Sequence, residues 1–115
     1  MGEIIKPVDI KSLPIGDLGL PTKWWGEVAL FSLSDAALLL DYCSDNGLAV
    51  LGVEGFRIEG NHRIPDVDAI ADFSGLMKVS STSFAERSIA AMREFLKMLP
   101  QDGEMLEFVL VESSS

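Results

Sequence analysis

The stretch over residues 48–58 (LAVLGVEGFRI) constrains the fold of this chain more than any other part. It is the longest run rich in β-branched and apolar residues, and turn-forming Asn-Gly and Gly-Asn pairs bound it at 46–47 and 60–61. This pattern predicts a central strand, or a strand pair bent at Gly52 and Gly55, against which the rest of the chain packs. The two glycines also indicate a β-bulge or a close approach of another backbone segment.

Two amphipathic helices are predicted, over about residues 33–46 and 84–99. Apolar residues recur at helical spacing in both segments. A serine that can accept a hydrogen bond from a first-turn N–H group precedes each one: Ser32 or Ser34 for the first and Ser83 for the second. One helix therefore comes before the central strand and the other after it.

Further strands are predicted on either side of the helices. Residues 27–31 form a short candidate strand, and residues 105–111, apolar on both faces except for one glutamate, predict a strand inside the sheet. After the central strand, residues 59–62 predict a hairpin tip. Pro65 places the returning segment at a sheet edge, because proline cannot donate to a strand ladder. Residues 66–74 fit either a strand or a helix, and we favour the strand.

These elements predict an α+β fold in which two helices pack on a mostly antiparallel sheet. A chain of 115 residues suits one domain with a single core. Residues 1–26 are rich in Pro and Gly, which predicts an irregular or short extended segment that packs on the domain. The serines at 113–115 predict a frayed tail.

The formal net charge of −9 at pH 7 is concentrated in the middle of the chain. Residues 27–75 contain nine acidic side chains against two arginines. The electrostatic field of this negative charge repels nucleic acid and anionic lipid and attracts basic partners. No apolar run approaches the ~20 residues that span a bilayer, and the N-terminus lacks the pattern of a secretory signal. Because the single cysteine, Cys43, cannot form an intrachain disulfide, we expect a cytoplasmic protein.

Motifs for catalysis, cofactors or metal ions are absent from the sequence. His62 is the only histidine and falls at the predicted hairpin tip, where a solvated side chain is the ordinary case. The patterns of phosphate-binding loops, dinucleotide-binding folds, nucleophile elbows and zinc sites do not occur. Cys43 lies on the apolar stripe of the first helix and is predicted to be a core residue. We therefore predict a protein that is not an enzyme and uses neither cofactor nor metal.

The residues predicted to contact a partner are acids from the middle of the chain and two adjacent tryptophans. Because a strand alternates its faces, only a subset of the acids is expected to act. One tryptophan is expected to fill the core and the other to anchor the partner. The set comprises Glu54, Glu59, Asp66, Asp68, Asp72, Trp24 and Trp25. As a strand, the segment 66–74 places Val67, Ala69, Ala71 and Phe73 on one face and Asp66, Asp68, Ile70 and Asp72 on the other.

Three motifs, FSLSDA at 31–36, GLAVLGVEGF at 47–56 and IADFS at 70–74, point to a known group of proteins. Together they resemble small bacterial immunity proteins of the polymorphic and contact-dependent toxin systems. The resemblance implies a cytosolic α+β domain that neutralises a cognate toxin by stoichiometric binding, without catalysis. The acidic middle of the chain suits that role, because nuclease toxins are basic where they bind phosphates.

Two other functions fit the sequence. The mean hydropathy of +0.27 and the apolar segment 105–111 also suit a homodimeric structural or scaffold protein. A small-ligand or enzyme site built on Asp66, Asp68 or Asp72 would require a deep pocket that raises their pKa values. The acidity would equally serve solubility alone.

Overall fold

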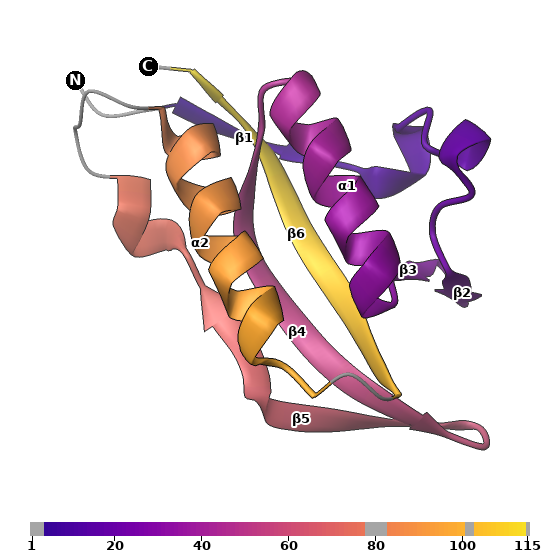
Figure 1. Cartoon of the computed structure of the whole chain (residues 1–115). Coiled ribbons are helices and arrows are strands. Elements are labelled where there is room, and N and C mark those ends of the chain that lie inside the picture. The colour runs from indigo at the N-terminus through magenta and orange to yellow at the C-terminus, as the bar shows by residue number, and fades with distance from the viewer. Residues whose placement is uncertain (1–3, 78–82, 101–102, 115) are drawn as a thin grey trace.

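A four-stranded antiparallel sheet with two helices on one face forms the centre of the molecule (Figure 1). The structure is a computed structural model that describes residues 4–77, 83–100 and 103–114. The sheet order is β1 (Ile4–Val8), β6 (Glu104–Ser114), β4 (Leu48–Glu59) and β5 (His62–Asp72), and the helices are α1 (Leu33–Asp45) and α2 (Phe84–Met98). The predicted α+β class is confirmed.

The two inner strands, β6 and β4, carry the core, as their apolar sequences predict. Val50 and Val53 of β4 and Leu106, Phe108 and Leu110 of β6 are buried in one cluster with side chains of α1 and α2. We call these five residues the covered face of the sheet. The ring of Phe108 lies edge-to-face with that of Phe31, with 5.6 Å between the ring centroids. Cys43 is fully buried in the same cluster, and burial raises its pKa to about 12, as suits a core residue.

Both glycines of β4 lie where the sequence predicts an irregularity. The register between β4 and β6 shifts between Val50 and Gly52. At Gly55 the neighbouring strand β5 approaches closely: a Cβ atom placed on Gly55 would lie 2.3 Å from the Cβ atom of Ala69. Only glycine fits at this point of the covered side without displacing β5.

Serine caps begin both helices as predicted, and the helix bounds differ from the predicted ones by one residue at the C-terminal ends. The Oγ atom of Ser32 accepts a hydrogen bond from the N–H of Asp35, and that of Ser83 accepts one from the N–H of Glu86. α1 ends before Gly47, whose φ of 68° is the left-handed conformation that glycine adopts most readily.

The hairpin of β4 and β5 is confirmed, with β5 at the sheet edge, but the alternation within β5 is not the one predicted. Glu54 pairs with Ile70, whereas the next residue, Gly55, pairs with Asp66. Residues 67–69 therefore bulge out of register, and Val67, predicted to share the inner face with Ala69, is 78% exposed. The bulge resets which side chains face inward.

The two ends of the chain are more ordered than the sequence indicates. Residues 4–8 form the edge strand β1, which pairs with β6 from Leu110 to Ser114. The expected frayed tail is therefore strand at residues 113 and 114, while residue 115 lies outside the described part. Before α1, the chain forms a separate two-stranded hairpin, β2 (Lys23–Trp25) and β3 (Val28–Leu30), after two short 3-10 turns, η1 (Ile10–Ser12) and η2 (Gly16–Leu18).

Helical elements of the described part cover the second face of the sheet at one end. There, η3 (Ser74–Met77) and the first turn of α2 pack against Ala49 and Val111 in a small second cluster. The start of β4 has no β5 partner, and the hydroxyl of Ser88 on α2 instead accepts a hydrogen bond from the N–H of Val50, at 3.0 Å. α2 thus closes this stretch of sheet edge.

Candidate functional site

The middle of the second sheet face has no helix over it in the described part of the chain. In the three-strand register, Ile70 and Glu107 lie on either side of Glu54, and Asp72 and Val109 lie on either side of Gly52. Directly paired residues project to the same side, so these side chains share one surface. We call it the open face: Gly52, Glu54, Ile70, Asp72, Glu107 and Val109.

The open face contains a shallow hollow of about 220 Å³, which these residues line. Gly52 contributes no side chain, so it forms a low point between Asp72 and Val109. The apolar side chains are half exposed, 48% for Ile70 and 50% for Val109. Half-exposed apolar side chains beside carboxylates give a surface with both an apolar and an acidic component.

The acids of the open face are only partly matched by bases. The Arg63 guanidinium lies 3.4 Å from the Glu107 carboxylate and 4.2 Å from the centroid of the Phe56 ring. Glu54 and Asp72 have no ion pair among the described residues. The N–H of Ser74 donates to the Asp72 carboxylate at 2.9 Å, which lowers the pKa of Asp72 and keeps it charged.

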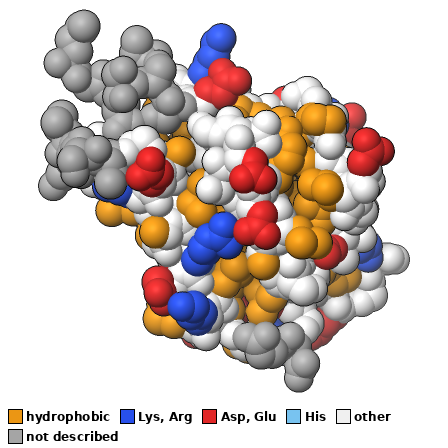
Figure 2. All heavy atoms as spheres, turned by 45° about the horizontal axis from the view of Figure 1, so that its top comes forward, with side chains coloured by type: hydrophobic (Ala, Val, Ile, Leu, Met, Phe, Trp, Pro, Cys, Tyr) orange, Lys and Arg blue, Asp and Glu red, His pale blue; other side chains and the backbone are white. Residues whose placement is uncertain are grey.

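The helix side of the molecule differs from the open face in how its acidic side chains are paired with bases. On the face turned toward the viewer in Figure 2, acidic and basic side chains lie near one another, with strips of apolar side chains between them. Within the described part of the chain, the helices carry the ion pairs of Arg93 with Asp41 at 2.9 Å and of Lys97 with Glu94 at 3.3 Å. Unmatched acids with apolar neighbours are therefore a feature of the open face.

Trp24 extends the open face toward the β2–β3 hairpin. It is 45% exposed and lines a second hollow of about 180 Å³ together with Glu107, which also lines the first hollow. Trp25 is half-buried, with the Lys23 ammonium 5.4 Å from its ring centroid. The prediction that one tryptophan fills the core is wrong, because β2 pairs only with β3 and lies outside the main sheet.

The structure brings together three of the seven predicted contact residues and separates the other four. Glu54, Asp72 and Trp24 lie on or beside the open face. Glu59 lies opposite His62 at the end of the hairpin, Asp66 lies just before the bulge of β5, and Asp68 lies within it. Trp25 lies on the neighbouring β2–β3 hairpin.

Glu107 belongs to the open face but was missed by sequence reasoning. The signal available in the sequence was its position as the single charged residue within residues 105–111. A charge in a strand between two other strands must point to a solvated face, and its pairing with Glu54 follows from the register alone.

A buried carboxyl group, that of Glu104, lies away from the open face at the start of β6. Glu104 is 3% exposed, and its carboxyl oxygens have no hydrogen-bond donor among the described residues as long as both it and Asp66 are ionised. Burial and the neighbouring Asp66 carboxylate raise the pKa of Glu104 to about 7. Protonated Glu104 can donate to Asp66, and this hydrogen bond lowers the pKa of Asp66. Arg57, directly opposite Glu104 on β4, partly offsets the effect on Glu104.

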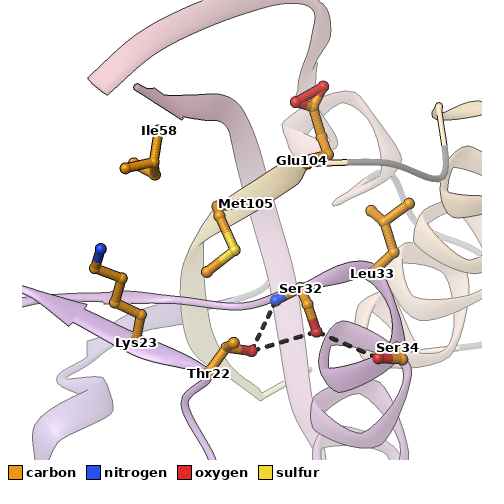
Figure 3. Close-up of a pocket in the computed structure, with 9 residues that line it drawn as sticks. Thr22, Lys23, Ser32, Leu33, Ser34, Ile58, Glu104 and Met105 are labelled. Carbon is orange, nitrogen blue, oxygen red and sulfur yellow. Dashed lines mark hydrogen bonds between the residues drawn. The ribbon is translucent and has the colours of Figure 1, made fainter. Parts of the chain in front are cut away.

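A cavity of about 620 Å³ lies between the start of β2, the start of α1, the end of β4 and the start of β6 (Figure 3). Its hydroxyl groups are bonded to one another, to the backbone and to a carboxylate. The N–H of Ser32 donates to Thr22, the Thr22 hydroxyl donates to Asp35, and the Ser32 hydroxyl lies 3.3 Å from those of Thr22 and Ser34. In Figure 3 the carboxyl group of Glu104 points away from these hydroxyls. The described residues that line the cavity include no histidine or cysteine.

A ligand or enzyme site built on Asp66, Asp68 or Asp72 would require a deep pocket that raises the pKa values of these carboxyl groups. The pKa values of Asp66 and Asp72 are instead lowered, by the hydrogen bonds each accepts. Among the described residues, no three His, Cys, Asp or Glu side chains gather closely enough to hold a metal ion. The described part also contains no helix long and apolar enough to cross a membrane.

Comparison of the chain with protein-family models, with curated proteins and with solved structures finds no match.

Proposed function

We propose that this protein neutralises a cognate bacterial toxin domain in the cytoplasm by stoichiometric binding, without catalysis. The single observation that carries the proposal is the open face, where Glu54 and Asp72, which form no ion pair with any described residue, lie beside the half-exposed Ile70 and Val109. An uncovered sheet face of this composition is suited to contact a protein, because apolar side chains supply affinity and the acids supply selectivity.

The charge of the chain supports a basic partner. The net charge of −9 attracts a positively charged domain over a distance and speeds its association at low salt. A nuclease-like toxin presents such a surface where it binds phosphates, so an acidic inhibitor can occupy that surface in place of the substrate.

Homodimerisation through the same face is the less favoured alternative. A two-fold dimer would place the same surface patch of each copy against the other. Glu54 and Asp72 of one copy would then face the acids of the second copy, and like charges in an interface oppose association.

The test has two steps: the gene beside this one is examined for a toxin domain, and that domain is then titrated with this protein. We expect a 1:1 complex by light scattering, complete loss of toxin activity at one equivalent, and an association rate that falls steeply between low and high salt. Inactivation by a small fraction of one equivalent would indicate catalysis and would contradict the proposal. A stable dimer of this protein that binds no toxin domain would favour the scaffold alternative.

A further inference from the structure

The pairing of Glu54 with Glu107 is the starting point for a more specific inference. Glu54 on β4 lies directly opposite Glu107 on the antiparallel strand β6. Like charges in this arrangement repel each other and destabilise the sheet. Arg63 compensates the charge of Glu107, at 3.4 Å, but no described side chain compensates that of Glu54.

The hollow beside Glu54 has the shape and lining to receive a cationic side chain. Gly52 leaves room at its low point, and Ile70 and Val109 offer apolar surface on the two neighbouring strands. Asp72 lies diagonally across from Glu54, within reach of the same cation. A long cationic side chain can rest its methylene groups on the apolar walls and direct its charge to the carboxylates.

We infer that the open face docks a basic protein partner by receiving one of its arginine side chains in the hollow between Glu54 and Asp72. This inference rests on the proposed function and names the chemistry of the partner's contact. Arginine suits the site better than lysine because a planar guanidinium can bind two carboxylates at once and is more weakly hydrated. The Arg63 guanidinium, which lies over Phe56 and beside Glu107, is held in a similar way on this same face.

The first experiment uses a short peptide in place of the partner. The probe is acetyl-Val-Arg-Val-amide, titrated into ¹⁵N-labelled protein and followed by NMR. We expect shifts of the amide signals of Gly52, Glu54, Ile70 and Val109, weaker shifts with lysine in place of arginine, and none with the neutral isostere citrulline. Shifts centred elsewhere on the molecule, or equal shifts with citrulline, would overturn the inference.

Matched variants separate a local site from the general effect of charge. The double variant Glu54→Gln/Asp72→Asn should weaken peptide binding at least tenfold. The control Glu59→Gln/Asp68→Asn removes the same charge from the hairpin end and the bulge and should change affinity less than twofold. All four positions are exposed, so the variants should keep the wild-type fold, which their NMR spectra report. Equal weakening in both variants would show that only net charge matters and would overturn the inference.

The same variants distinguish this inference from the proposed function. If the adjacent-gene toxin domain binds with unchanged affinity to Glu54→Gln/Asp72→Asn, the arginine site is wrong and the inhibitor proposal stands. If the arginine peptide binds in the hollow but no toxin domain binds, the inhibitor proposal is wrong and the site serves another basic protein.

Discussion

The covered face and the open face of the sheet are built from the same strands yet differ in almost every physical respect. Phe108 is 4% exposed and packs under the helices, whereas its neighbour Val109 is 50% exposed on the other side. On the covered face, close packing supplies the stability and leaves little room for change. On the open face, Ile70 and Val109 are half exposed, so substitutions there should cost less stability.

The alternation of strand residues therefore separates the core from the surface that we propose for recognition. Substitutions at Glu54, Ile70, Asp72 or Val109 should leave the core beneath them in place. The following predictions test how complete this separation is.

The largest effect is expected on the covered face. Phe108→Ala should lower the free energy of unfolding by about 3–5 kcal/mol, since it leaves a cavity and removes the contact with Phe31. Denaturant unfolding measures the change. The adjacent Val109→Ala should cost less than about 1 kcal/mol because the side chain is half exposed. Similar costs at both positions would contradict the separation of the two faces.

The next effect concerns the close approach of β5 to β4. Gly55→Ala should cost about 1–3 kcal/mol, because the new Cβ atom would lie 2.3 Å from that of Ala69 and β5 must move. Gly75→Ala is the control, since a Cβ atom there meets nothing within 4 Å. Thermal unfolding of both variants measures the difference in stability. An unchanged melting temperature for Gly55→Ala would show that β5 can move at the bulge without loss of stability.

The buried Glu104 should make stability depend on pH. Its pKa of about 7 in the folded state lies above the ordinary 4.5, so the folded state holds the proton more tightly. This stabilisation is complete below pH 4.5 and is lost as the pH rises through 7. The lowered pKa of Asp66 acts in the opposite direction, and its contribution is lost only at more acidic pH.

Glu104→Gln tests this pH dependence directly. The amide can donate to Asp66 at every pH, so the variant should lose the decline in stability between pH 5 and 8. At pH 8 it should be more stable than the wild type by on the order of 1–2 kcal/mol. Urea unfolding at the two pH values measures the difference. A parallel decline in wild type and variant would rule out Glu104 as the group responsible.

The smallest effect is expected on the open face and has the opposite sign. Glu54→Gln removes the repulsion from Glu107, so it should raise the free energy of unfolding by about 0.2–0.5 kcal/mol. Glu59→Gln, which lies opposite His62, provides a control for the loss of one charge. A loss of stability in Glu54→Gln would mean that its carboxylate is already compensated in the free protein, which would weaken the case for a cation supplied by the partner.

Much of the secondary structure could be predicted because its signals are local. Ser32 and Ser83 cap their helices, the glycines at 47 and 60 adopt positive φ at the ends of α1 and β4, and Pro65 marks an edge strand. Each of these effects acts over a few residues, so the residue types alone identify the element.

The candidate site could be predicted only in part because strand register is not local. The bulge at residues 67–69 resets the alternation of β5, which separates Asp66 from Asp72 and exposes Val67. Nothing in the composition of 66–74 requires an interruption at that point, and the close approach of Ala69 to Gly55 becomes visible only when both strands are placed.

The sequence by itself determined the helices, the hairpin, the inner strands and the acidic character of the middle of the chain. Only the tertiary structure decided that Glu107 lies opposite Glu54, that Glu104 is buried against Asp66, and that residues 4–8 pair with residues 110–114. The physical reason is that caps, turns and periodicity act between neighbours in the chain. Pairing and burial instead join residues far apart in sequence, and the packing of the whole domain selects which of them meet.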